Sequence, residues 1–316
     1  MEVDSHLCAL SGRCIHIPYL FGHRAAKRTK YLTEDDKVVV KPFYDKGCDF
    51  FGPKEGKILV SNSTNFFRND LPWNTLGKTL DELYPEGEKV NVFNFACSDG
   101  SEPYSLAICL IEQLGEERAK RFFPIKASDI DSEIIPKGKK DKIIADKKDI
   151  ENINEITNNN IKKYFNVKHL KERTVTSPKG TVEFKDEEFI LTPKKILKDC
   201  VKFDCQNFYD GLDDLKEKNN LVLCRNFWGY LKEDEILKCA KKLYNRLDES
   251  SFMIIGDFDL DDGNIPKFLT ELGIDSATDT WKEETILQKH EGYSDGKYKD
   301  ELLMNIDAYY YHRKKC

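Results

Sequence analysis

Hydrophobic and polar positions follow two alternating periods from about residue 90 onward. Stretches such as residues 233–247 repeat apolar side chains at three- and four-residue steps, which is typical of an amphipathic helix. Between such stretches lie short apolar runs bounded by turn residues, as expected of buried strands. These runs are residues 92–95, 125–128, 201–205, 221–224 and 252–256. Strands that alternate with helices predict an α/β fold with a mostly parallel sheet and helices on both faces.

Two segments depart from this alternation. Residues 149–165 are polar, rich in asparagine and helical in pattern, and residues 173–191 hold two β-prone runs around a turn at 177–180. We interpret the latter as an inserted β-hairpin subdomain at about residues 168–198. Near the chain end, residues 284–288 and 302–312 are strand candidates that predict a final antiparallel pair at the sheet edge.

The first sixty residues have a different character. They are rich in turn residues and offer one short strand candidate at residues 38–40. We therefore predict an atypical N-terminal segment over residues 1–60 and one α/β domain over residues 61–316.

Composition narrows the class of protein. A 316-residue chain that is 40% hydrophobic can bury an ample core, and its net charge of -6 gives no electrostatic footprint for nucleic acid. No apolar run reaches about 18 residues, so we expect no membrane insertion. The N-terminus lacks the pattern of a signal peptide, and the ten cysteines look like reduced, buried thiols. We expect a soluble, cytoplasmic monomer.

The most informative stretch is the turn after the first apolar run. Residues 96–102 read A-C-S-D-G-S-E and lead into a helix, so that strand, glycine turn and helix N-terminus form the ligand corner of a doubly wound sheet. The turn lacks the G-x-G-x-x-G spacing, and the chain has no phosphate-binding P-loop motif. An adenosine ligand without phosphates therefore fits better, and S-adenosylmethionine (SAM) is the obvious candidate. Glu102 could pair with a ligand ammonium or hydroxyl, or only offset the helix dipole.

Other candidate residues follow the apolar runs. Asp129 ends the second run, 29 residues after Gly100, where such folds bind ribose hydroxyls, although an aspartate there could also cap a helix. Arg225 and Asn226 follow the fourth run directly. A charged residue at that place needs a partner, which could be a ligand or a structural salt bridge.

Four segments together resemble one known family. Residues 62–68 read N-S-T-N-F-F-R, residues 96–107 read A-C-S-D-G-S-E-P-Y-S-L-A, residues 127–131 read A-S-D-I-D, and residues 224–231 read C-R-N-F-W-G-Y-L. In this order they resemble the motifs N-x-T-x-F-F-R, A-C-S-x-G-E-E-P-Y-S-L-A, A-T-D-I-D and C-R-N-x-x-x-Y-F of the CheR family. These are the SAM-dependent methyltransferases of bacterial chemotaxis receptors. The resemblance implies a Rossmann-like class I methyltransferase fold.

The resemblance also implies residue roles. Arg68 would lie near the incoming carboxylate and Tyr230 would face the reacting methyl group, which makes these two the expected catalytic residues. Asp129 would hold the ribose, and Asn207 and Phe208 would flank the adenine. The full set of implied cofactor-binding residues is Asn62, Thr64, Arg68, Gly100, Glu102, Asp129, Asn207, Phe208, Arg225 and Asn226.

Some positions depart from the family pattern. Ser101 replaces the first acid of the turn, and Phe208 stands where the family has leucine. Residues 1–60 do not read as the helical N-terminal domain that meets the receptor in family members. The inserted hairpin resembles the small β-subdomain that docks a receptor tail in some members.

The expected reaction is methyl transfer from SAM to a glutamate side chain of a protein, such as a chemoreceptor cytoplasmic domain, with S-adenosylhomocysteine (SAH) as product. A glutamate with a pKa near 4.3 is ionised at neutral pH, so no general base is needed and alignment dominates. One alternative is a SAM-dependent methyltransferase for another protein or a small acid. Another is a SAM-binding signalling module without turnover.

We expect no metal site. One cluster near the N-terminus could suggest zinc, but it lacks the usual C-x₂-C or H-x₃₋₅-H spacing. Its members are His6, Cys8, Cys14 and His16.

Overall fold

The computed structural model describes part of the chain, and of some strand residues only the backbone. The described residues are 28–33, 57–62, 64–68, 71–131, 134–136, 141–176, 183–228, 231, 233–248, 250–256, 259, 274–276 and 309–313.

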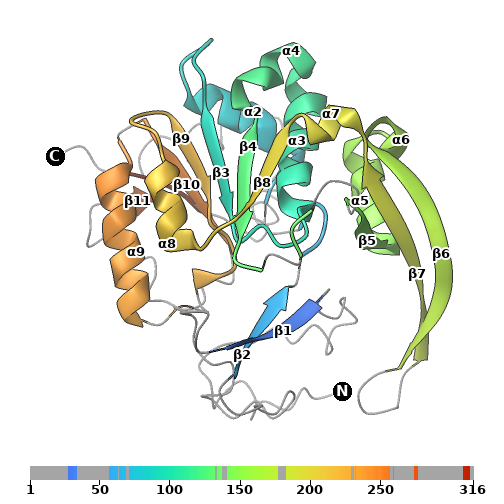
Figure 1. Ribbon diagram of the computed structural model, residues 1–316. Coiled ribbons are helices and arrows are strands. Elements are labelled where there is room, and N and C mark those ends of the chain that lie inside the picture. The colour runs from blue at the N-terminus through green and yellow to red at the C-terminus, as the bar shows by residue number, and fades with distance from the viewer. Residues whose placement is uncertain are drawn as a thin grey trace, which may run out of the picture.

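A seven-stranded sheet forms the centre of the described structure, in the order β11-β12-β10-β9-β3-β4-β8 (Figure 1). The five strands from β10 to β8 are parallel to one another. They are β3 (Asn91–Phe95), β4 (Ile125–Asp129), β8 (Val201–Cys205), β9 (Asn220–Leu223) and β10 (Phe252–Ile255). Each matches one of the predicted apolar runs, which confirms the α/β fold class.

The edge of this sheet is antiparallel, as predicted. β12 (Tyr309–Arg313) pairs antiparallel with both β10 and β11 (Ile274–Ser276). β12 corresponds to the strand expected over residues 302–312. The other expected strand, residues 284–288, lies outside the described residues, and β11 was not predicted.

Helices cover both faces of the sheet because side chains alternate along each strand. On β9 and β10, Leu221, Leu223 and Ile254 contact the core beneath α2 and α3, whereas Val222 and Met253 pack against α9. The helices and helical turns of this domain are α2 (Trp73–Leu83), α3 (Ser101–Leu114), α4 (Glu116–Ala119), η3 (Lys120–Phe122), α7 (Lys195–Lys198), α8 (Phe208–Gly211), η5 (Leu212–Asp214) and α9 (Glu233–Arg246).

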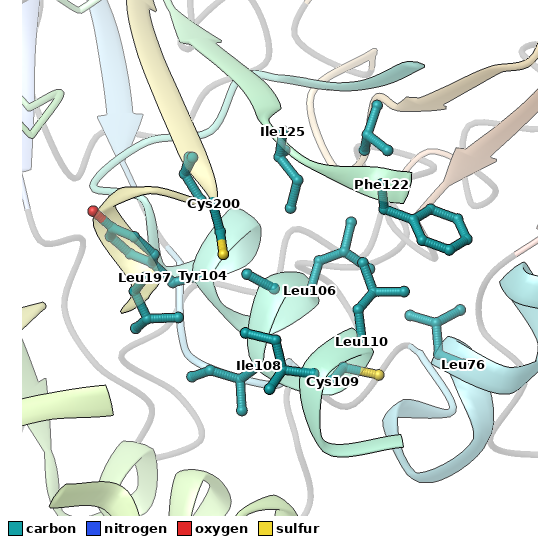
Figure 2. Close-up of a cluster of buried hydrophobic side chains, with 14 of the residues drawn as sticks. Leu76, Tyr104, Leu106, Ile108, Cys109, Leu110, Phe122, Ile125, Leu197 and Cys200 are labelled. Atoms are coloured by element: carbon teal, nitrogen blue, oxygen red, sulfur yellow. The ribbon is translucent and has the colours of Figure 1, made fainter. Parts of the chain in front are cut away.

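α3 is the most enclosed helix of this domain. Its side chains Leu106, Ile108 and Leu110 are fully buried. Figure 2 shows Leu106 and Leu110 between Leu76 of α2 and Ile125 of β4, with Ile108 on another side of the helix. A helix enclosed in this way holds its N-terminus firmly against the sheet, which matters because the glycine turn leads into that end. None of the helices in the described part of the chain is long and apolar enough to cross a membrane.

A small three-stranded antiparallel sheet, in the order β5-β7-β6, lies beside the main sheet (Figure 1). Its long hairpin confirms the predicted insertion, although the expected turn at residues 177–180 lies outside the described residues. The predicted helical stretch 149–165 is divided by Asn158 and Asn159, whose φ values are 51° and 63°. The elements are β5 (Ile143–Asp146), α5 (Lys147–Ile156), α6 (Ile161–Tyr164), β6 (Phe165–Thr176) and β7 (Glu183–Pro193).

Two N-terminal strands were not predicted. β1 (Arg28–Thr33) and β2 (Lys57–Asn62) pair antiparallel. The strand candidate at residues 38–40 lies outside the described residues. β2 runs across residue 60, and the division into residues 1–60 and 61–316 stays a prediction.

Candidate functional site

The turn between β3 and α3 is strained. Ala96, Ser98 and Gly100 have φ values of 54°, 52° and 87°. The left-handed conformation costs a residue with a side chain about 1–2 kcal/mol. Such strain persists only where the surroundings enforce it, and it concentrates at binding sites. At Gly100 a Cβ would also lie 2.8 Å from Cζ of Phe203 on β8, so both conformation and space require glycine.

α3 begins one residue after Gly100. The Asp99 carboxylate accepts hydrogen bonds from the backbone N–H and the hydroxyl of Ser101, at 3.0 and 2.7 Å. Pro103 is the third residue of the helix. It still lies in the first turn, where a missing N–H leaves no broken bond.

Asp129 ties this turn to the neighbouring strand. Its carboxylate accepts the backbone N–H of Ser98 at 2.8 Å and that of Asp131 at 2.9 Å. No helix in the described residues begins at Asp129, so Asp129 does not act there as a helix cap. Burial raises the pKa of Asp129, and the two N–H donors act against that shift. Both oxygens keep lone pairs for a further donor, such as a ribose hydroxyl.

Glu102 and Arg225 meet above the carboxyl ends of β3 and β9. They form an ion pair, and the amide of Asn94 on β3 donates to the same Glu102 carboxylate at 2.6 Å. The Arg225 side chain is 0% exposed and that of Glu102 is 16% exposed. The partner that Arg225 needs is therefore the acid at the start of α3, which is the structural salt bridge weighed as one alternative for Arg225.

Trp73 connects Arg225 to the segment that carries Arg68. The Arg225 guanidinium lies 6.0 Å from the centre of the Trp73 ring, and the indole N–H donates to the backbone oxygen of Arg68 at 2.6 Å. Arg68 is half-buried, and within the described residues its guanidinium forms no ion pair.

Side chains of two helices hold the residues before Arg68. The N–H of Phe66 donates to Asp149 of α5 at 2.8 Å, and Asn152 of the same helix donates to the Phe66 oxygen at 3.0 Å. The N–H of Phe67 donates to the Ser105 hydroxyl of α3 at 2.9 Å. This aromatic pair is part of the core, and it positions Arg68 as well.

Asn207 and Phe208 lie next to each other at the start of α8. The Asn207 side chain caps that helix by accepting the N–H of Asp210 at 2.9 Å. Phe208 packs edge-on against Phe95 of β3 and against Trp228, with ring centres 5.1 Å apart in each case. The structure thus places Phe208 at the end of β3, near the strained turn.

The remaining expected site residues are described to different extents. Thr64 is half-buried, and only the backbone of Asn62 is described, at the end of β2. Tyr230 lies outside the described residues, as does the cluster at residues 6–16. Asn226 follows β9 with a φ of 60° and donates its N–H to Asp259.

Sequence reasoning did not name several residues that shape this site. Asn94 could have been noticed as a polar residue inside the buried run of β3, where its exposed fraction is 0%. No local signal marked the others, because their contacts join segments far apart in the sequence. These residues are Trp73, Asp149 and Asp259.

Comparison with known proteins agrees with this geometry. Residues 62–268 match the sequence profile described as the CheR methyltransferase SAM-binding domain. The chain belongs to the CheR methyltransferase family. As a CheR-family protein it is a SAM-dependent methyltransferase, and SAM is its cofactor.

Curated relatives of the CheR-family chain carry the name chemotaxis protein methyltransferase. The protein of Borreliella burgdorferi is 26% identical over 80% of this chain and 88% of its own length. That of Listeria monocytogenes is 26% identical over 63% of this chain and 65% of its own length, and a Vibrio cholerae relative is 23% identical over 63% and 62%. The chain therefore spans less than two thirds of these last two relatives.

Solved structures of other methyltransferases also align with the chain. Precorrin-6y C5,15-methyltransferase from Geobacter metallireducens has 10% identity and a TM-score of 0.32, over 63% of this chain and 70% of that one. Magnesium protoporphyrin IX methyltransferase from Synechocystis, with bound SAM, has 15% identity and a TM-score of 0.30, over 65% and 70%.

The residues of the turn fit the cofactor of the CheR family. Within the described residues, the buried Ser98 hydroxyl and the side-chain amide oxygen of Asn94 lack hydrogen-bond partners. Buried polar atoms without partners are rare, and here a ligand rich in hydroxyl and ammonium groups can supply them. Two nearby thiols offer no competing nucleophile, because burial raises the pKa of Cys97 and Cys224 and keeps them neutral.

Proposed function

We propose that this protein methylates a glutamate side chain of a protein substrate, with SAM as methyl donor and a glutamate methyl ester as product. By its relation to chemotaxis methyltransferases, the substrate is a chemoreceptor-like cytoplasmic domain. Tyr230 and Arg68 would be the groups nearest the reacting atoms.

One observation carries the proposal. Arg68 is half-buried, its backbone oxygen accepts the Trp73 indole N–H, and no carboxylate of the described residues pairs with its guanidinium. A planar guanidinium is well suited to bind a carboxylate with two parallel hydrogen bonds. An incoming glutamate would supply the missing counterion, and a neutral acceptor would not.

The bound cofactor supplies an electrophilic methyl group, and the protein provides alignment. The acceptor carboxylate is ionised at neutral pH, so no side chain has to remove a proton. In agreement, the described histidines lie elsewhere: His169 is on β6, and His312 pairs with Phe252 at the opposite end of β10. Arg68 would orient the carboxylate, and the buried Glu102–Arg225 pair would fix the floor of the site.

A direct test is methyl transfer from labelled SAM to fragments of receptor cytoplasmic domains. We expect a product whose label is released as methanol by mild base, as an ester requires. Arg68→Ala should lower kcat/KM by roughly 10- to 100-fold, the effect of losing one charge-assisted hydrogen bond, and should leave SAH affinity within a few-fold.

Arg118→Ala is the matched control, because Arg118 is a half-exposed arginine of α4 that pairs with Asp81 away from the site. It should keep full activity. A base-stable product would contradict the carboxylate acceptor, and full turnover of Arg68→Ala would contradict the role of Arg68. SAH binding without transfer to any acidic acceptor would favour a signalling module.

A further inference from the structure

Three backbone N–H groups converge on one buried carboxylate that the family motifs quoted above do not include. Asp259 accepts the N–H of Trp228 on Oδ1 at 2.9 Å, and the N–H groups of Asn226 and Gly256 on Oδ2 at 2.5 and 3.1 Å. Its exposed fraction is 0%. The donors follow β9 and β10, which are neighbouring parallel strands, so this carboxylate joins two loops at the carboxyl edge of the sheet.

The bonds from Asn226 and Trp228 fix an unusual backbone shape. Asn226 has a φ of 60°, a conformation that residues with side chains rarely adopt without support. Its neighbours on both sides are constrained too, because Arg225 is paired to Glu102 and the Trp228 indole donates to the Cys224 oxygen at 2.9 Å. Asp259 thus binds the turn at the strained residue itself and at Trp228, two positions further along the chain.

Gly256 leaves the space that the side chain of the same asparagine occupies. A Cβ at Gly256 would lie 2.3 Å from Oδ1 of Asn226, so the amide occupies the space that any other residue would fill. Asn226 is therefore held through its backbone by Asp259, and its amide can take this position only because Gly256 has no side chain.

We propose that Asp259 is a positioning residue for cofactor binding, which holds the turn of residues 225–228 so that Asn226 faces SAM. The proposal rests on the placement of Asn226 in the cofactor pocket, and it is independent of the methyl acceptor. Gly256 serves the same turn by leaving room for the Asn226 amide.

A double-mutant cycle on SAH affinity, measured by calorimetry, tests this role without any acceptor. Asp259→Asn keeps the volume but exchanges one acceptor oxygen for a donor, and should raise the SAH dissociation constant at least tenfold. Asn226→Gly tolerates the same φ and removes the amide, with a comparable loss. If Asp259 acts through Asn226, the double variant binds SAH no more weakly than Asn226→Gly alone. Losses that multiply, or SAH binding by Asp259→Asn within twofold of wild type, would overturn the proposal.

Asp81→Asn is the matched control, since Asp81 is also a buried carboxylate but pairs with Arg118 and Arg121 away from this edge. It should lower the melting temperature and leave the SAH dissociation constant within twofold.

Two further measurements test the proposal even if Asp259→Asn does not fold. Gly256→Ala displaces only the end of the Asn226 side chain, so the protein should fold and bind SAH at least fivefold more weakly; unchanged affinity would contradict the proposal. In the wild-type protein without cofactor, the N–H groups of Asn226 and Trp228 should exchange with deuterium as slowly as those of β9. Exchange at the rate of exposed loops would show that Asp259 does not hold the turn.

Discussion

The charge of Arg225 is enclosed by protein, with a carboxylate partner that is itself nearly buried. An ion pair in such a place contributes little net stability compared with apolar residues, but removing one partner is strongly unfavourable. We therefore interpret the pair as a rigid surface for a ligand rather than as a contact that stabilises the fold. Its rigidity comes from the Asn94 amide, which binds the second oxygen of Glu102.

The Glu102→Gln variant tests this at the residue scale. Removing the negative charge beside a buried guanidinium should destabilise the fold by about 3–5 kcal/mol, measured by urea unfolding. Asp213→Asn is the comparison, because Asp213 pairs with Lys242 and Arg246 at 2.8 and 2.6 Å but is 57% exposed. That variant should be indistinguishable from wild type, and equal losses in both would contradict the difference in burial.

Asp259 adds a dependence on pH. Burial raises its pKa from 3.8 to about 7, against the opposing effect of its three N–H donors and Arg225. A raised pKa means that the folded state binds the proton more tightly than the unfolded state, so its contribution to stability is present at pH 4 and is lost as the pH rises to 7.

The free energy of unfolding of wild type minus that of Asp259→Asn should accordingly fall between pH 4 and pH 8. Three pKa units correspond to a change on the order of 4 kcal/mol. Urea unfolding of both proteins at several pH values measures it. A difference that stays constant with pH would mean that Asp259 has an ordinary pKa.

At the scale of elements, α5 links the small subdomain to the segment of Arg68. Asp146 and Asp149 form a capping box at its start, with the Asp149 N–H donating to Asp146 at 2.8 Å. Asp149 also reaches beyond the helix, to the N–H of Phe66. One helix start thus serves two purposes, its own cap and the anchoring of the turn at Phe66.

Asp149→Ala and Asp146→Ala should separate these purposes. Each loses a cap worth about 1 kcal/mol, whereas Asp149→Ala also leaves the buried Phe66 N–H unpaired, at a further cost of about 1–3 kcal/mol. We expect Asp149→Ala to lower methyl transfer more than SAH affinity, because it frees the Arg68 segment. Thermal unfolding and calorimetry measure these effects, and identical behaviour of the two variants would argue against the anchoring role.

At the scale of the whole molecule, the β6–β7 hairpin extends away from the main sheet (Figure 1). His169 and Phe189 stand opposite each other on its two strands, and Leu191 beyond them is fully buried. Replacing residues 170–188 by Asn-Gly would close the hairpin at this pair and keep its buried base. We expect SAH affinity within twofold of wild type, measured by calorimetry. A large loss would show that the distal hairpin supports the cofactor pocket.

Much of this architecture could be predicted from the sequence. Strands buried on both faces read as continuous apolar runs, so the five parallel strands and the corner at Gly100 were recognisable. β5 was missed because its four residues, I-I-A-D, carry no clear period. The contact of Asp259 with Asn226 was missed because a hydrogen bond between residues 33 positions apart leaves no local pattern. A structural salt bridge was one of the alternatives for Arg225, but Glu102 was not foreseen as its partner.

The anchoring of the Arg68 segment has a consequence for how such proteins diversify. The nucleoside pocket is built on strand ladders, which tolerate few changes, whereas the Phe66–Phe67 backbone is fastened by three side chains from Asp149, Asn152 and Ser105. Individual side-chain contacts of this kind can be changed one at a time by substitution without disturbing the sheet. A protein lineage could therefore acquire a new methyl acceptor by substitutions at these three contacts, while its cofactor chemistry stays the same.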